Sequence, residues 1–175
     1  MWPGGCFMTP KSTSSENRKS ARKPSELRQF SDGLRKSAAL ARHPFGRFLV
    51  GPVMRWFARK TLRIRQARPE AGEGGVRTLA EEYQRLFPNK RMYEITELTD
   101  DTAFFEIHVQ CPLRGTGDVR ACHRLMQYDR SMAAHLGANF RVLESQSMTG
   151  AETCRVALRR KGLPTNDLIE PHERG

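Results

Sequence analysis

Residues 102–136 read TAFFEIHVQCPLRGTGDVRACHRLMQYDRSMAAHL, and a change of pattern within this stretch decides the fold class. Up to residue 111, apolar and polar residues alternate, which predicts a strand with one buried face. From Val119 to Leu136 the apolar residues return every three or four positions, which predicts a helix with one buried face. A short loop with two glycines joins these elements, so a strand is followed directly by a helix.

Further strands flank this pair in the sequence. The same period of two predicts a strand at residues 92–98 before it and strands at residues 139–148 and 153–159 after it. The last two meet at a turn that contains Gly150. The order β-β-α-β-β predicts an α+β fold, an antiparallel sheet with helices packed on one face.

The first part of the chain is predicted to be helical and basic. Apolar residues at helical spacing indicate helices at residues 25–41 and 45–64, the second with a break at Gly51-Pro52. The chain therefore divides into a disordered basic terminus at residues 1–24, a basic amphipathic helical segment at 25–68, an α+β core domain at 69–163 and a C-terminal tail at 164–175.

Positive charge is concentrated before the core domain. The chain has 30 Lys and Arg against 19 Asp and Glu, a net charge of +11. Up to residue 70 the count is 16 against 4, which leaves 14 against 15 beyond it. The basic arm is expected to make at most weak contact with anionic surfaces such as lipid head groups or nucleic acid, whereas the near-neutral core suits a small-molecule substrate.

The sequence also bears on cell compartment. No run of about 18 apolar residues is free of charge, so no membrane span is predicted. The first residues lack the basic and apolar regions of a secretory signal. A cytoplasmic chain with reduced thiols is therefore expected.

Three cysteines in the last part of the chain fall on faces that periodicity assigns to the interior. They are Cys111, Cys122 and Cys154. A buried cysteine most often serves as a small apolar residue. Cys111 is the best nucleophile candidate, because it lies just before the loop and helix N-terminus whose amides, together with Arg114, would favour a thiolate.

Asp129 lies in the middle of the apolar helix stripe, close to Met126. A carboxylate there must be paired, hydrogen-bonded or protonated. One reading is a structural ion pair with Arg141 or Arg155. The other is a functional acid that acts as general base or holds a cationic amidine-type nitrogen.

Metal and cofactor sites are not predicted. The cysteine spacings contain no C-x-x-C pair, which structural zinc sites commonly use. The sequence Gly115-Thr116-Gly117 lacks the fuller phosphate-loop pattern.

The run Cys111-Pro112-Leu113, a glycine-bearing loop, a helix with Asp129, and then Gly150 and Cys154 after a strand resembles the L-2-amino-thiazoline-4-carboxylic acid hydrolase family. The resemblance covers about residues 75–160. It implies a helix-plus-antiparallel-sheet domain that cleaves a C–N or C–S bond of a small cyclic amidine or isothiourea. By matching position it marks Cys111 and Asp129 as catalytic, with Cys122, Met126, Cys154 and Arg114 in contact with substrate.

The resemblance also leaves alternatives open. Members of that family often have a cysteine three residues before the helix acid, where this chain has Met126, and Cys122 lies one turn earlier. The arrangement is also distantly similar to vinyl-reductase-type domains, which implies binding of a small molecule without hydrolysis. A third reading is an adaptor for nucleic acid or membrane surfaces through residues 18–68, and a homo-oligomer is a further prediction.

Overall fold

The computed structural model describes residues 24–174, so the predicted disordered terminus lies outside the described residues apart from Pro24. The helices are α1 Pro24–Arg42, α2 Val50–Ile64, α3 Val76–Arg85, α4 Val119–Leu125 and α5 Gln127–His135. The strands are β1 Tyr93–Leu98, β2 Thr102–Ile107, β3 Ala138–Glu144 and β4 Cys154–Arg160. Single turns of 3-10 helix stand between some of these elements and near the end of the chain.

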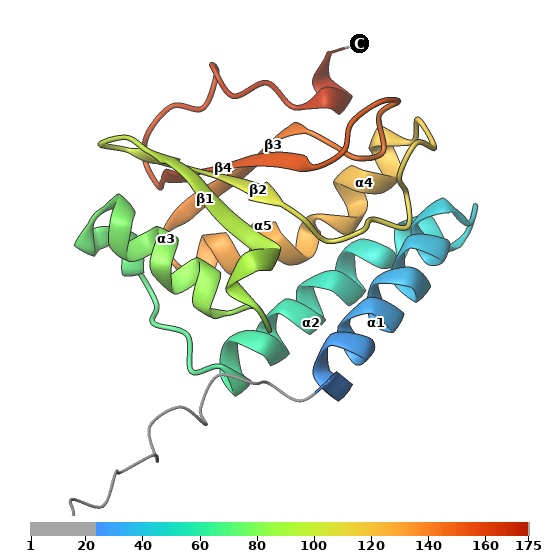
Figure 1. Cartoon of the computed structure of the whole chain (residues 1–175), viewed down its shortest axis with the longest axis horizontal. Helices are drawn as coiled ribbons and strands as arrows, with labels where there is room; N and C mark the ends of the chain where they lie inside the picture. The colour runs from blue at the N-terminus through green and yellow to red at the C-terminus, as the bar shows by residue number, and fades with distance from the viewer. Residues whose placement is uncertain (1–23, 175) are drawn as a thin grey trace, which may run out of the picture.

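The four strands form one antiparallel sheet in the order β1-β2-β4-β3 (Figure 1). In the centre of the sheet Phe105 of β2 pairs with Val156 of β4, and Val142 of β3 pairs with the same residue from the other side. These three side chains are buried, as the period of two predicts. The predicted α+β fold is confirmed.

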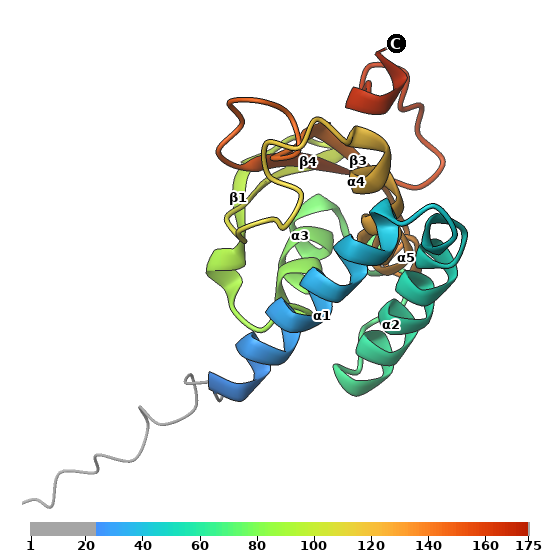
Figure 2. The ribbon, with the colours of Figure 1, turned by 90° about the vertical axis from the view of Figure 1, so that its right-hand side faces the viewer.

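The helices lie in two layers on one face of the sheet (Figures 1 and 2). Helix α3 packs against β1 and β2, and α5 packs against β3. Helices α1 and α2 form the outer layer, in which α2 contacts α5 and α1 contacts α4. Ala41 and Ala58 are fully buried, so the basic helical segment of residues 25–68 belongs to the same hydrophobic core as the sheet. Within residues 24–174, no helix combines the length and the apolar character that crossing a membrane requires.

The C-terminal segment is folded onto the opposite face of the sheet (Figure 1). Arg141 of β3 pairs with Glu173, and Leu168 is buried. Glu170 accepts a hydrogen bond of 2.9 Å from the backbone N–H of Val142. Residues 164–174 therefore close the edge of the sheet at β3 instead of forming a free tail.

Two predicted helix boundaries are wrong. The helix predicted from Val119 to Leu136 is divided into α4 and α5 at Met126, whose ψ of 4° departs from helical geometry. The break predicted at Gly51-Pro52 falls earlier, because both residues lie in the first turn of α2. Proline is tolerated there, since the first-turn amides have no acceptor within the helix.

Candidate functional site

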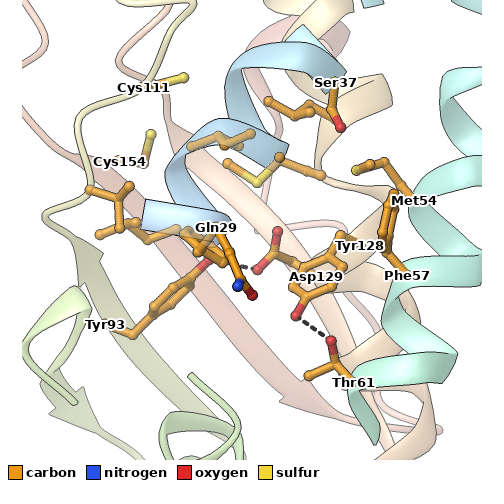
Figure 3. Close-up of a pocket in the computed structure, with 17 residues that line it drawn as sticks. Gln29, Ser37, Met54, Phe57, Thr61, Tyr93, Cys111, Tyr128, Asp129 and Cys154 are labelled. Atoms are coloured by element: carbon orange, nitrogen blue, oxygen red, sulfur yellow. Dashed lines mark hydrogen bonds between the residues drawn. The ribbon is translucent and has the colours of Figure 1, made fainter. Parts of the chain in front are cut away.

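A cavity of about 200 Å³ lies where helices α1 and α2 meet α5 and the inner face of the sheet (Figure 3). Its walls are mostly aliphatic, aromatic and sulfur-containing side chains. Helix α1 contributes Gln29 and Ser37, and α2 contributes Met54, Phe57 and Thr61. The cavity therefore depends on the N-terminal helices, which the sequence analysis placed outside the core domain.

Four of the six predicted site residues line this cavity: Cys111, Met126, Asp129 and Cys154. They come from the loop after β2, the junction of α4 and α5, helix α5 and the start of β4. Figure 3 shows the two thiols on one side of the cavity and the Asp129 carboxyl group below them. The predicted meeting of thiols with the helix acid in one apolar space is therefore observed for these residues.

The structure does not bring the other two predicted residues into the cavity. Arg114 is exposed in the glycine-bearing loop. Cys122 is buried, but it lines a separate and much smaller space beside His123 and Arg130. Its Sγ accepts a hydrogen bond of 3.1 Å from the Ser145 hydroxyl. Cys122 shares a stripe with Asp129 but not its cavity, because it lies two turns earlier, on the other side of the break between α4 and α5.

Asp129 is held by two tyrosines. The hydroxyls of Tyr83 and Tyr93 both donate to its Oδ1, at 2.9 and 2.8 Å. The second carboxyl oxygen, Oδ2, receives no hydrogen bond from a side chain among the described residues. In Figure 3 this oxygen points into the cavity. The structural ion pair expected with Arg141 or Arg155 is wrong, because hydroxyls take the place of the cation.

This environment raises the pKa of Asp129. Burial disfavours the charged form and outweighs the hydrogen bonds from Tyr93 and Tyr83, which lower the pKa. Burial and the adjacent carboxylate also raise the pKa of both tyrosines well above their usual value, so both stay hydroxyl donors. A carboxyl group with a raised pKa and one free oxygen can accept a proton or hold an N–H group of a ligand.

The three thiols are also shifted away from the charged form. Burial raises the pKa of Cys111, of Cys122 to about 11 and of Cys154 to about 12. The Cys111 Sγ accepts a long hydrogen bond of 3.4 Å from the backbone N–H of Leu113. The thiolate expected at Cys111 is therefore disfavoured, because its local environment is apolar and does not supply the charge of Arg114 or the amides of α4.

A buried glutamine fixes the positions of two of these cysteines. Strand β2 ends at Ile107, earlier than the predicted residue 111, and the side chain of Gln146 continues the pairing from there. Its Oε1 accepts from the Cys111 N–H at 3.0 Å, and its Nε2 donates to the Val109 carbonyl at 2.9 Å. Its own backbone N–H donates to the Cys154 Sγ at 3.2 Å. Cys111 thus faces inward although it lies in a loop.

Sequence reasoning missed the tyrosines. Tyr83 lies in α3 and Tyr93 at the start of β1, and the sequence analysis singled out neither as a site residue. A buried tyrosine hydroxyl needs a partner, and so does a buried carboxylate. That shared need is the signal that connects Tyr83 and Tyr93 to Asp129. Tyr128, whose hydroxyl donates to Thr61 at 3.0 Å, was missed as well.

A second polar cluster lies around Glu170, next to the smaller space. The ligand atoms of His123, Glu170 and His172 all lie within 4.8 Å of one another. Glu170, however, already receives two hydrogen bonds from Arg130, at 2.6 and 2.7 Å. A carboxylate neutralised by a guanidinium is a poor ligand for a cation, so this cluster stabilises the C-terminal segment.

The chain was compared with protein-family models and with curated proteins. No protein-family model matches it, and no curated protein matches it either. Membership of the L-2-amino-thiazoline-4-carboxylic acid hydrolase family stays a prediction that rests on the residues quoted above. The predicted homo-oligomer is likewise untested.

Proposed function

We propose that the cavity binds a small cyclic amidine or isothiourea and that the protein hydrolyses one of its C–N or C–S bonds, as the resemblance to the L-2-amino-thiazoline-4-carboxylic acid hydrolase family implies. One observation carries this proposal. Asp129 is the charged residue of a largely apolar cavity, and its Oδ2 has no side-chain donor among the described residues. An amidine offers two adjacent N–H groups, which match a carboxylate oxygen in such a place.

The proposed reaction needs one activated water. Asp129 takes a proton from the water while the water oxygen adds to the amidine carbon. The ring C–N or C–S bond then breaks. The leaving nitrogen or sulfur takes the proton back from Asp129, so water is the only species consumed. The raised pKa of Asp129 suits this exchange, because an efficient general base has a pKa closer to neutral pH than an ordinary aspartate has.

Cys111 is the alternative attacking group in this proposal. Its raised pKa favours water as the nucleophile, since only a small fraction of a thiol is thiolate when its pKa exceeds the surrounding pH.

Free thiols at Cys111, Cys122 and Cys154 support a reducing, cytoplasmic location.

The test is a ligand screen by thermal shift, followed by turnover assays on each hit. We expect a cyclic amidine to raise the melting temperature of the wild type, and Asp129→Asn to reduce its affinity at least 10-fold. Glu173→Gln, which removes an exposed carboxylate, is the matched control and should bind normally. Equal binding by wild type and Asp129→Asn would contradict the proposal.

A companion pair of variants identifies the nucleophile. Cys111→Ser should keep most of the turnover if water attacks, and should lose it if the thiol attacks. Cys122→Ser is the control, because Cys122 is buried but does not line the cavity.

The second candidate function is binding without turnover, as in vinyl-reductase-type domains. The raised pKa of all three thiols favours it over a hydrolase that uses a thiol nucleophile, because no described cysteine has the environment of an activated thiolate. Saturable binding that depends on Asp129, with no product formed over hours, would establish this candidate over the hydrolase.

We also propose that the connection between α1 and α2, together with the exposed face of α2, contacts anionic lipid surfaces weakly. Phe45 and Phe48 of the connection are 81% and 69% exposed, and Trp56 of α2 is 54% exposed. These aromatic residues belong to a segment, residues 24–68, with 11 Lys and Arg against 2 Asp and Glu. The Arg47 guanidinium lies over the Phe48 ring, and the Lys60 ammonium lies near the Trp56 ring. Aromatic side chains flanked by basic ones suit the boundary between head groups and acyl chains.

Sedimentation with vesicles tests this contact. Binding should require phosphatidylserine, weaken steeply as salt rises, and fall at least fivefold in the double variant Phe48→Ser, Trp56→Ser. Ile169→Ser, at an exposed apolar residue of the C-terminal segment, is the control. Equal binding to neutral vesicles, or none at low salt, would contradict the proposal.

A further inference from the structure

The charge of the cavity wall points to a narrower class of substrate. Of the 17 described residues that line the cavity, Asp129 alone carries a charged group. The lining includes no lysine, arginine or histidine. The polar groups that remain are neutral, among them Gln29, Ser37 and the Thr61 hydroxyl, which already accepts from Tyr128.

Three guanidinium groups of the surrounding helices are already engaged. Arg65 lies near Tyr128, but its Nη2 is 3.1 Å from the Glu26 carboxylate. Arg130 faces the Glu170 carboxylate in the second cluster. Arg124 donates through two nitrogens to the Ala41 carbonyl, at 3.2 and 2.9 Å. None of these cations lines the cavity, so an anionic group in a ligand would find no partner of opposite charge there.

An anionic ligand would also meet Asp129. Two carboxylates in one apolar space repel each other, and an unpaired charge in such a space is strongly disfavoured. A neutral or cationic ligand avoids both costs. A cationic one gains an ion pair with the carboxylate, and an apolar body gains contact with Phe57, Met54 and the other aliphatic walls.

From these observations we infer that the substrate is an apolar amidine, guanidine or isothiourea that has no carboxylate or phosphate group. This inference rests on the proposed function and specifies its substrate. The inferred substrate also differs from the compound after which the family is named, because L-2-amino-thiazoline-4-carboxylic acid carries a carboxylate on its thiazoline ring.

Three probes built on one ring test the inference. They are 2-aminothiazoline, its 4-phenyl derivative and its 4-carboxylate, each titrated into the full chain by calorimetry. We expect the phenyl probe to bind most tightly and the carboxylate at least 10-fold more weakly than the phenyl probe. If the carboxylate binds as tightly as either of the others, the inference is overturned while the proposed function stands. If none of the three binds, the amidine-type function fails and the inference fails with it.

A gain of binding provides the second readout. Gln29 lines the cavity from α1 and its side chain is exposed, so a longer side chain fits there without burial (Figure 3). Gln29→Arg should strengthen binding of the carboxylate probe at least 10-fold relative to the phenyl probe. Gln29→Met, a variant of similar size without charge, should leave the order of the three probes unchanged. Equal affinity of wild type and Gln29→Arg for the carboxylate probe would overturn the inference, provided that circular dichroism shows both to be folded.

Discussion

Asp129 and Glu170 are both buried, with 5% and 1% of their surface exposed, but their surroundings shift their pKa values in opposite directions. Burial raises the pKa of each carboxyl group. At Glu170 this is outweighed by His123, by Arg130 and by the N–H of Val142, so that the pKa falls to about 2. At Asp129 the partners are uncharged hydroxyls, and the pKa stays raised.

The difference separates a structural carboxylate from one that is available to a ligand. The chain itself neutralises Glu170, and the resulting cluster attaches the C-terminal segment to α5 and β3. The chain orients Asp129 through one oxygen and forms no direct ion pair with it among the described residues. A buried acid that its own fold does not neutralise is typical of binding and catalytic sites, although structural networks can perturb a pKa as well.

The largest expected effect comes from removing the guanidinium beside Glu170. Arg130→Met leaves a buried carboxylate without its cation, which should lower the free energy of unfolding by about 3–5 kcal/mol. Urea denaturation at pH 7 measures this loss. Arg141→Met, which breaks the exposed pair with Glu173, is the control and should cost less than about 1 kcal/mol. Comparable losses in the two variants would remove the contrast between a buried and an exposed pair.

The contrast between these two carboxylates shows what the sequence could and could not predict. Periodicity placed Asp129 on a buried helix face, because a period of 3.6 is a local property. It gave no sign of Glu170, which follows a stretch with Pro and Gly and is buried only because the chain returns to β3. Sheet and helix order follow from local pattern, whereas partners such as Tyr83 and Tyr93 depend on contacts 46 and 36 residues away.

The segments that enclose the cavity could not be predicted either, because they too meet through contacts between residues that are distant in the sequence. Cys111 and Cys154 were placed inward by alternation, but Cys111 lies beyond β2 and is directed inward by Gln146. Helix α1 was read as part of a separate arm, since its sequence alone does not identify α4 as the surface that its apolar face covers.

Acidification should affect the two carboxylates in opposite ways. Glu170 has a pKa of about 2 in the folded chain against 4.5 in the unfolded chain. Its contribution, on the order of 3 kcal/mol, is therefore present above pH 4.5 and is lost as the pH falls toward 2. The pKa of Asp129 is raised, so its contribution is greatest at low pH and is lost as the pH rises through the folded pKa.

Unfolding measured from pH 7 to pH 3 distinguishes the two. The stability difference between wild type and Glu170→Gln should close on acidification. In contrast, wild type should gain stability relative to Asp129→Asn over the same range. A difference between wild type and Asp129→Asn that is constant with pH would show that the Asp129 pKa is not raised.

Replacing Asp129 itself should have a moderate effect that depends on the substitute. Asp129→Leu removes the acceptor and leaves the hydroxyls of Tyr83 and Tyr93 buried without a partner, at a cost of about 1–3 kcal/mol. Asp129→Asn keeps an oxygen for them and removes a buried charge, so it should change stability by less than about 1 kcal/mol. Thermal unfolding at pH 7 compares the pair. A larger loss for Asn than for Leu would mean that the charge itself stabilises the fold.

The smallest expected effect is a difference in ligand affinity between variants of Tyr83 and Tyr93. Tyr83→Phe and Tyr93→Phe each remove one hydroxyl that donates to the Asp129 Oδ1, so each should lower stability by about 1 kcal/mol. Only Tyr93 lines the cavity, and therefore only Tyr93→Phe changes the wall that a ligand touches. We expect ligand affinity to fall further in Tyr93→Phe than in Tyr83→Phe, at equal stability. Calorimetric titration with the phenyl probe measures this difference, and equal losses would mean that both tyrosines act on the ligand only through Asp129.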